Sequence, residues 1–451
     1  MSVRLAPLPS LIACAGCGTA VDPVEPYPFR CPHAGDGADH VLRRLLDVES
    51  LAFPTGDEHE HNPFVRFRAL SHAHQLAMAG GLGDDGFVEL VQALDAAVAG
   101  VDGHGFRATP FVEAPSLAGA AGVSGPLFIK DETGNVAGSH KGRHLFGVLV
   151  HLEVAERLGL ADRRHRRRLA IASCGNAALA AAVVAAAGRR RLLVFVPREA
   201  DPAVLERLSA LGAEVTVCER QAGVAGDPTY HRLRAALTAG ALPFTCQGSE
   251  NGLVVEGGET LGYEVVASLA AAGRSLDHIV VQVGGGALAS AVAAALREAV
   301  AFKVMERAPR IHTVQTESAW PLKRAFRRVE ALLGGESGPE QVRRAVQRAS
   351  RRRSDFMWPW EGAPRSVAHG ILDDETYDWL AVVEAMLLTG GRPVVVGEEQ
   401  LEKANALAGE LTGLAADATG TAGLAGLVAL VDEGVVGDGE SVAVLFTGVR
   451  R

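Results

Sequence analysis

Lysine is the basic residue that this chain of 451 residues hardly uses. Only five lysines stand among its 44 lysines and arginines. An arginine cannot lose its proton and form an imine, so Schiff-base chemistry is confined to those five positions. One of them, Lys141, follows Gly138, Ser139 and His140 in a glycine-containing turn. That setting makes Lys141 the first candidate for a catalytic residue.

Cysteine is also rare, and long apolar runs and an excess of positive charge are absent. Six cysteines in so long a chain do not make a disulfide framework, which suits a reducing compartment. We find no run of about 18 apolar residues and no charged-then-apolar leader. The net charge of -9, with both signs interspersed, argues against a nucleic-acid surface. We therefore expect a cytoplasmic protein that binds small molecules and neither nucleic acid nor membrane.

Strand and helix patterns alternate along much of the chain, whose length indicates two or three domains. Such alternation favours a mostly parallel sheet with helices on both faces. The sequence therefore predicts an α/β fold. The expected strands are 126–130, 169–172, 192–196, 214–218, 278–283 and 311–315, and the expected helices include 63–79, 87–98, 177–187 and 287–301.

Three of the six cysteines stand in the first fifty residues and suggest a zinc ribbon. Tetrahedral zinc needs four soft or borderline ligands on two turns, and it would staple a segment too small to have its own core. Alternatively, the segment is a decayed remnant that binds no metal. The candidate ligands are Cys14, Cys17 and Cys31 with His33, or with His40 or Asp36 in place of His33.

Apolar residues recur at a helical period after Lys141. Leu145, Val148, Leu149 and Leu152 share one helix face, which places Lys141 in the first turn. The positive end of that helix would favour the free amine over the ammonium. The alternative is an ordinary solvated lysine at a helix start, and stretches further along the chain weigh against it.

A glycine-rich loop, Gly284-Gly285-Gly286-Ala287-Leu288, lies between a predicted strand and a predicted helix. Its backbone N–H groups and the helix dipole would form a nest for a phosphate. The spacing also fits a dinucleotide fingerprint, with Glu317 as the ribose-binding acid. A nucleotide site would leave Lys141 without a role.

The stretch Ser173-Cys174-Gly175-Asn176 also lies between a predicted strand and a predicted helix. Its N–H groups would face the carboxyl edge of the sheet, where ligands bind. Asn176 could orient a cofactor hydroxyl, or it could simply cap the helix that follows. Cys174 has no histidine adjacent in sequence, which argues against a catalytic thiol.

Taken together, the motifs occur in an order that resembles the pyridoxal-phosphate enzymes of fold type II. Residues 138–141, 173–176, 255–264, 284–288 and 445–448 carry the resemblance. The chain most closely resembles the threonine synthases, from about Thr109 to the C-terminus, and its N-terminal ribbon is similar to one found in some of them. The resemblance implies a tryptophan synthase β-like fold of two three-layer domains, pyridoxal 5'-phosphate as the cofactor and a homodimer.

The resemblance also implies roles for single residues. Lys141 would hold the cofactor as a Schiff base and later move the α and β protons. Asn176 would bond the 3-hydroxyl of the cofactor, and the loop 284–288 would bind its phosphate. Thr447 would contact the pyridine nitrogen, where a neutral hydroxyl suits elimination better than transamination. The expected substrate-binding residues are Ser139, His140, Ser173, Cys174 and Gly175.

The same resemblance implies a division of the chain. Residues 1–50 would be the zinc-ribbon-like segment, and residues 51–141 with 256–451 would form a large cofactor-binding domain. Residues 142–255 would form a small mobile domain that closes over the substrate.

The expected reaction is that of a lyase acting on an amino acid with a β or γ leaving group, and the conversion of O-phosphohomoserine to threonine is the closest case. Several residues depart from the threonine synthase pattern, among them Ala177, Ala178 and His140. Ala177 and Ala178 stand where hydroxyl residues are usual, and His140 either donates a proton to a leaving hydroxyl or packs beside the cofactor. One alternative is β elimination of the serine/threonine dehydratase type, or β replacement, on a specialised amino acid. Another is a non-catalytic regulatory protein with the same fold.

Overall fold

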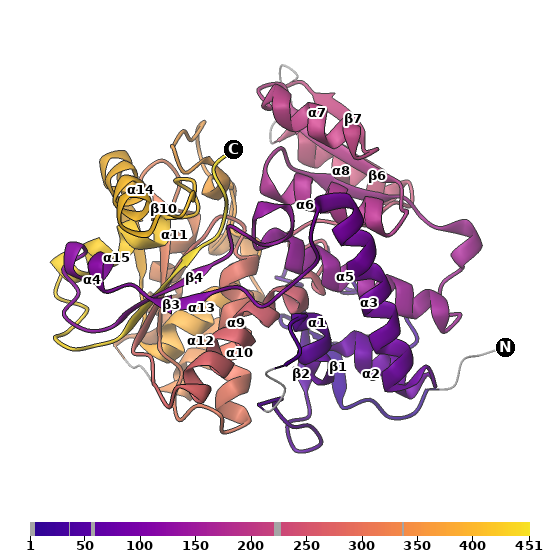
Figure 1. Cartoon of the computed structure of the whole chain (residues 1–451), viewed down its shortest axis with the longest axis horizontal. Helices are drawn as coiled ribbons and strands as arrows, with labels where there is room; N and C mark the ends of the chain where they lie inside the picture. The colour runs from indigo at the N-terminus through magenta and orange to yellow at the C-terminus, as the bar shows by residue number, and fades with distance from the viewer. Residues whose placement is uncertain (1–4, 36, 56–58, 221–226, 336–337) are drawn as a thin grey trace.

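The computed structural model describes residues 5–35, 37–55, 59–220, 227–335 and 338–451. Two lobes lie side by side, and the C-terminus lies near their border (Figure 1). In the described residues, no helix has both the length and the apolar character that crossing a membrane requires.

One lobe is built on a six-stranded sheet with the order β11-β10-β9-β12-β4-β3. All neighbouring strands are parallel except β3, which runs antiparallel to β4 at the edge. The central strand β12 pairs with β4 on one side and β9 on the other. The strands are β3 (Phe111–Glu113), β4 (Leu127–Asp131), β9 (His278–Gln282), β10 (Arg310–Thr316), β11 (Pro393–Val396) and β12 (Val442–Phe446).

Side chains of the central strands alternate between two cores, as the period of two along a strand requires. Ala443 and Leu445 of β12 join one core, whereas Val442 and Val444 join the other. The sheet is therefore the middle of three layers. The first core is covered by α9 (Val254–Ala271), α10 (Ala287–Ala301), α11 (Pro321–Glu330), α12 (Pro339–Ser350) and α13 (Trp379–Thr389), and the second by α4 (Pro115–Ala120), α14 (Glu398–Thr412) and α15 (Ala422–Asp432).

The other lobe contains a four-stranded parallel sheet with the order β7-β6-β5-β8. Ile171 of β5 packs in the core that includes α5 and α6, whereas Ala170 packs with Leu233 of α8 on the opposite face. The elements are β5 (Leu169–Ala172), β6 (Leu192–Pro197), β7 (Glu214–Cys218), β8 (Leu242–Pro243), α5 (Lys141–Arg157), α6 (Asn176–Ala187), α7 (Pro202–Ala210) and α8 (Pro228–Thr238). Both sheets confirm the predicted α/β fold.

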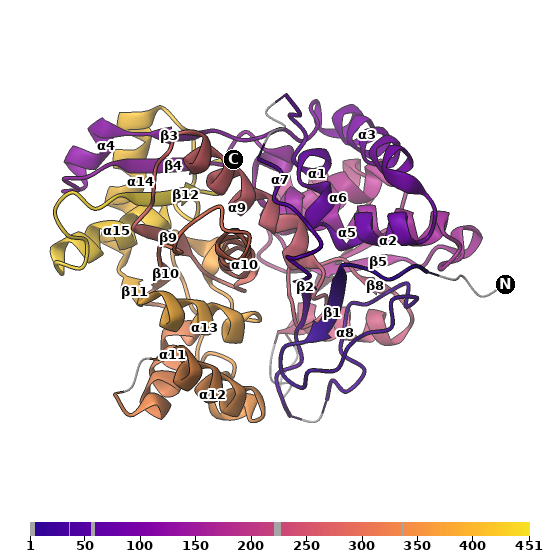
Figure 2. The ribbon, with the colours of Figure 1, turned by 90° about the horizontal axis from the view of Figure 1, so that it is seen from below.

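The N-terminal segment forms a two-stranded antiparallel ribbon of β1 (Ser10–Cys14) and β2 (Leu42–Leu46). It lies below the junction of the lobes (Figures 1 and 2). Arg44 of β2 pairs with Glu259 of α9 and with Glu298 of α10, where the Nη2–Oε1 distance is 2.9 Å. Buried ion pairs thus connect the ribbon to α9 and α10, which cover the six-stranded sheet.

The predicted helix over 63–79 is divided in the structure, and this prediction was wrong in its continuity. It forms α1 (Pro63–Arg66), a short 3-10 turn and α2 (His72–Ala79), followed by the longer α3 (Gly83–Asp102). The Glu256 carboxylate accepts hydrogen bonds from Ser71 Oγ at 2.8 Å and from the His72 N–H at 2.9 Å. A residue distant in sequence therefore starts α2, which no local pattern could reveal.

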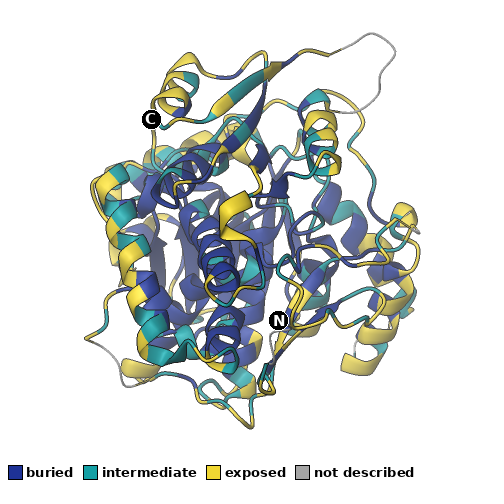
Figure 3. Cartoon of the chain, turned by 90° about the vertical axis from the view of Figure 1, so that its right-hand side faces the viewer, coloured by how far each residue is buried: buried dark blue, intermediate teal, exposed yellow. Residues whose placement is uncertain are grey.

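Buried residues dominate the inner helices and strands, and most exposed residues lie on the outer helices and loops (Figure 3). Val91 and Val98 of α3 belong to the same core as Val148 of α5 and Val184 of α6. This core extends across the expected domain boundary at residue 141. The domain boundaries, the homodimer and the location in the cell stay predictions.

Candidate active site

Lys141 is the first residue of α5, as the sequence predicts, and partners from the end of β12 hold the turn before it. Ser139 forms an isolated bridge with Gly448, and the His140 N–H donates to the Thr447 carbonyl at 3.3 Å. The structure therefore brings the lysine motif and the C-terminal Thr447-Gly448 motif together.

Lys141 is half-buried, and groups from several segments feel its charge. For five buried groups near Lys141, burial is the largest cause of the pKa shift. The lysine charge adds to the effect of burial on the two histidines, and it opposes the effect of burial on the cysteine and the two aspartates. The pKa values of His140 and His144 are lowered, and those of Cys246, Asp373 and Asp378 are raised.

His140 and His144 are buried neutral imidazoles. Burial and then the Lys141 charge lower the pKa of His144 to about 3 and that of His140 well below its usual value. His140 Nδ1 lies 3.1 Å from the Thr447 carbonyl, and His144 Nδ1 lies 2.7 Å from the Val254 carbonyl. A neutral imidazole that donates through Nδ1 keeps an acceptor at Nε2. His140 therefore has a hydrogen-bond acceptor at Nε2, and as a neutral imidazole whose Nδ1 hydrogen is engaged by Thr447 it has no proton at Nε2 to donate.

The turn Ser173 to Asn176 joins β5 to α6 and is half-buried throughout. Gly175 is the N-cap and Asn176 the first helical residue, so the helix-capping alternative for Asn176 is wrong. The Asn176 side chain instead accepts from Arg451 Nη2 at 3.1 Å. Burial raises the pKa of the Cys174 thiol, which makes a thiolate nucleophile less available.

The glycine loop joins β9 to α10, as the sequence predicts, and a second segment presses against it. Gly286 has a φ of 98° and starts the helix. Thr376 Oγ1 donates to the Gly284 carbonyl, and the Asp378 N–H donates to the Gly285 carbonyl, both at 3.0 Å. A Cβ on Gly284 would lie 2.9 Å from the Ile371 Cα, so only glycine fits there.

Two aspartates stand beside this loop and carried no signal in the sequence. Asp373 has a hydrogen bond with the Gly285 backbone, and burial raises its pKa to about 6. Asp378 is 2% exposed, and burial raises its pKa to about 7. A hydrogen bond with the Gly248 backbone opposes this rise. Both belong to an irregular segment without a periodic pattern.

Thr447 is positioned by Gln282, which also carried no signal in the sequence. Gln282 Nε2 donates to Thr447 Oγ1 at 2.7 Å and to the Gly420 carbonyl at 2.8 Å. Because the Thr447 oxygen accepts from Gln282, its own hydrogen is available for an acceptor elsewhere. This fits a hydroxyl that donates to a ring nitrogen.

A buried network of four charged residues supports the start of α5. Arg143 Nε lies 2.8 Å from Glu132 Oε2, and Arg143 Nη1 lies 2.7 Å from Glu264 Oε1. Lys130 completes the network with Glu264. Two positive and two negative charges thus neutralise one another between β4, α5 and α9. Because the partners lie far apart in the sequence, the spacing of residues within motifs does not predict these ion pairs.

The three N-terminal cysteines meet at one point with His40 rather than His33. Cys14, Cys17, Cys31 and His40 have ligand atoms within 4.8 Å of one another. His33 lies beside this cluster, with Nδ1 3.9 Å from Cys17 Sγ, and Asp36 lies outside the described residues. The choice of His33 over His40 thus does not match the arrangement in the structure.

Comparisons with known proteins agree with the motifs. Residues 104–448 match the family described as pyridoxal-phosphate dependent enzyme. The chain is 25% identical over 343 residues to a threonine synthase of Methanosarcina acetivorans, which covers 75% of this chain and 74% of that one. It is 30% identical over 196 residues to a serine dehydratase-like protein of Rattus norvegicus, with coverage of 43% and 53%.

The fold is also that of solved structures. Maize serine racemase matches with a TM-score of 0.58 at 17% identity, covering 81% of this chain and 93% of the racemase. At that identity the likeness shows the fold alone, and it confirms the expected fold type II architecture.

Proposed function

The chain belongs to the pyridoxal-phosphate dependent enzyme family, and on this premise we propose that it is a lyase acting on an amino acid with a β or γ leaving group. The observation that supports this most directly is the meeting of Lys141, the Thr447 motif and the glycine loop in one region. Lys141 and Thr447 are linked through His140, and the lysine charge reaches Asp373 beside the loop.

The residues present fit the cofactor. The glycine loop offers backbone N–H groups at a helix start, and Asp373 already places a carboxyl group against the Gly285 backbone. A phosphate would take the place of that carboxylate. Ser139 is fully buried, and its Oγ has no hydrogen-bond partner among the described residues. A buried hydroxyl of this kind suits a site that holds a polar ligand.

Each residue then has a task. Pyridoxal phosphate would supply an electron-withdrawing ring that stabilises the carbanion left by a departing α proton. Lys141 would hold the cofactor and, once its amine is free, take that proton. Thr447 would donate its hydroxyl hydrogen to the ring nitrogen, and Asn176 would bond the 3-hydroxyl. The N–H groups of 173–175 would bind the substrate carboxylate.

A conversion of the threonine synthase type, from O-phosphohomoserine to threonine, is the first specific candidate. Its support is the similarity to the archaeal threonine synthase over three quarters of both chains. One observation favours a second candidate, β elimination from a hydroxy amino acid. Ala177 and Ala178 occupy the first turn of α6 and offer no hydroxyl to a substrate phosphate.

One assay separates these candidates. The protein is incubated with O-phosphohomoserine, then with threonine and serine, and phosphate, threonine, ammonia and 2-oxo acid are measured. Phosphate with threonine identifies the synthase, and ammonia with 2-oxo acid identifies the dehydratase. A protein that takes up no pyridoxal phosphate would contradict the proposal and favour the regulatory alternative.

A structural zinc ion is proposed for the cysteine cluster, with His40 as the fourth ligand. Cys17 Sγ lies 3.6 Å from Cys31 Sγ, and Cys14 Sγ lies 3.4 Å from His40 Nδ1. Ligands about 2.1 to 2.3 Å from a tetrahedral centre lie roughly 3.5 Å apart, which is close to these separations.

A further inference from the structure

The cysteine cluster and the glycine loop are connected by a short chain of buried contacts. At the cluster end, Gly16 stands between Cys14 and Cys17, and a Cβ on Gly16 would overlap the Asp39 carbonyl. The next residue, His40, supplies the fourth atom of the cluster. The backbone at Asp39 is therefore fixed by the same turn that would hold a metal.

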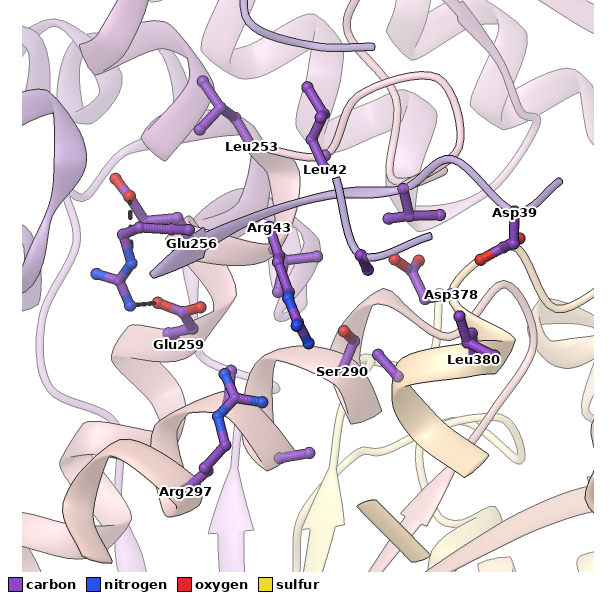
Figure 4. A pocket seen from close by; sticks show the side chains of 18 residues that line it. Asp39, Leu42, Arg43, Leu253, Glu256, Glu259, Ser290, Arg297, Asp378 and Leu380 are labelled. Carbon is purple, nitrogen blue, oxygen red and sulfur yellow. Dashed lines mark hydrogen bonds and ion pairs between the residues drawn. The ribbon is translucent and has the colours of Figure 1, made fainter. Parts of the chain in front are cut away.

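Asp39 connects the cluster to the lobe that is built on the six-stranded sheet, the large lobe. Its side chain is 2% exposed, and Oδ1 accepts a hydrogen bond from Trp379 Nε1 at 3.0 Å. The Asp39 N–H donates to the Ser350 carbonyl at 2.6 Å, and Arg353 Nε lies 3.4 Å from Oδ1. Figure 4 shows Asp39 and Asp378 lining the same pocket, between the ribbon and the helices of the large lobe.

Trp379 is fully buried and begins α13 directly after the segment that contacts the glycine loop. In that segment, Thr376 Oγ1 and the Asp378 N–H donate to the carbonyls of Gly284 and Gly285. In a trans peptide the C=O and the following N–H point in opposite directions. Fixing these two carbonyls therefore turns the N–H groups of Gly285 and Gly286 away from residues 376–378. The Gly285 backbone then meets the Asp373 carboxyl, which feels the Lys141 charge.

We propose that a metal ion bound by Cys14, Cys17, Cys31 and His40 holds the glycine loop in the orientation that binds the cofactor phosphate, with Asp39, Trp379 and Thr376 as positioning residues. The inference rests on the proposed function, because it requires pyridoxal phosphate at this loop. It goes beyond that function because it gives the ribbon a role in cofactor retention rather than in local folding alone.

Pyridoxal, which lacks the phosphate, separates this role from general stabilisation. Both aldehydes can react with Lys141, but only pyridoxal phosphate uses the loop. Binding of each is titrated by visible absorbance in zinc-replete protein and in protein stripped of zinc by a chelator. We expect the Kd of pyridoxal phosphate to rise at least tenfold on stripping and that of pyridoxal to change less than twofold. Equal Kd values for pyridoxal phosphate in the two preparations, or equal losses for both aldehydes, would overturn the proposal.

A variant tests the same connection with the metal in place. Trp379→Phe removes the indole N–H that Asp39 accepts, and Trp358→Phe is the matched control, because Trp358 Nε1 donates to Glu361 at an exposed site. Both variants should keep a full equivalent of zinc by elemental analysis. Trp379→Phe should weaken pyridoxal phosphate binding about five- to tenfold and leave pyridoxal binding unchanged. Identical affinities in the two variants would refute the connection.

Thr376→Val acts at the loop itself and should behave like Trp379→Phe. It removes the hydroxyl that bonds the Gly284 carbonyl without changing the side-chain volume much.

The wild-type protein separates failure of this inference from failure of the proposed function. If zinc-replete wild-type protein bound pyridoxal but not pyridoxal phosphate, the proposed phosphate-binding role of the loop would be wrong, whereas the proposed reaction of Lys141 with the aldehyde would stand. If it bound neither, the proposed function and this inference would both fail.

Discussion

The two strand-to-helix turns of the candidate site differ in how firmly the protein holds them. The turn before α6, Ser173 to Asn176, is half-buried, and a Cβ on Gly175 would meet no atom within 4 Å. The loop before α10 has two carbonyls fixed by residues 376–378 and backbone packed against Gly284. A rigid loop suits a permanent cofactor phosphate, whereas an open turn suits a substrate that enters and leaves.

The largest expected effect comes from removing Lys141, because the roles proposed for both turns depend on a cofactor held by this lysine. Lys141→Ala should abolish the visible band that borohydride bleaches and lower kcat by at least about a thousandfold, because the nucleophile and the proton-transferring base are lost together. Absorbance spectra and initial rates measure this. Lys403→Ala is the control, since that side chain is 73% exposed on α14. A reducible adduct that persists in Lys141→Ala would assign the cofactor to another lysine.

A pair of glycine substitutions tests the difference between the turns directly. Gly284→Ala should lower the free energy of unfolding by about 1 to 3 kcal/mol and weaken cofactor binding, because the new methyl group meets the Ile371 backbone. Gly175→Ala should change stability by less than about 1 kcal/mol. Its effect should be a higher KM for the amino acid. Urea denaturation and steady-state kinetics measure both, and equal stability losses would show that the turns are held alike.

Asp378, which contacts the glycine loop before α10, should make the stability of the protein depend on pH. Burial raises its pKa from 3.8 to about 7 in the folded protein, so the carboxyl takes up a proton on folding between these values. The contribution of Asp378 to wild-type stability should therefore fall as pH rises from about 4 to about 7 and stay level above. Asp378→Asn should remove most of this fall, about 2 to 4 kcal/mol at pH 8.

Thermal unfolding from pH 4 to pH 8 would measure this difference. The exposed Asp438 provides the matched change, because Asp438→Asn also removes one carboxylate. The interpretation of Asp378 as a protonated buried acid would fail if both variants followed the wild-type profile.

The smallest effect is expected at Cys174 in the open turn. Burial raises the pKa of its thiol, so Cys174→Ser should keep kcat/KM within about twofold of the wild type. Steady-state assays, supported by slow alkylation of the thiol at neutral pH, check this. A loss of more than about a hundredfold would restore the thiol as a candidate nucleophile.

The elements that could be predicted from the sequence are those that local patterns define. Glycines at strand ends and helical periodicity located both turns and placed Lys141 at the start of α5. The supporting residues could not be predicted in the same way. Thr376 and Asp378 lie in an irregular segment, and Gln282 reaches Thr447 only because β9 and β12 are neighbours.

The cysteine cluster shows the same limit. Spacing alone allowed His33, His40 or Asp36 as the fourth ligand. The structure places His40 beside the cysteines because β2 pairs with β1 in a register that sets Leu42 opposite Cys14. Register depends on the whole ribbon and its contact with α9 and α10, and no short motif records it.

The buried network around Arg143 limits how this protein can change. Removing one member of such a network leaves an unpaired buried charge and costs about 3 to 5 kcal/mol, whereas replacing oppositely charged partners together can be nearly neutral. Substitutions at Lys130, Glu132, Arg143 and Glu264 should therefore be tolerated in combination and rejected singly. For anyone who redesigns substrate preference, these four positions are best kept unchanged, while the open turn before α6 is the place to introduce variation.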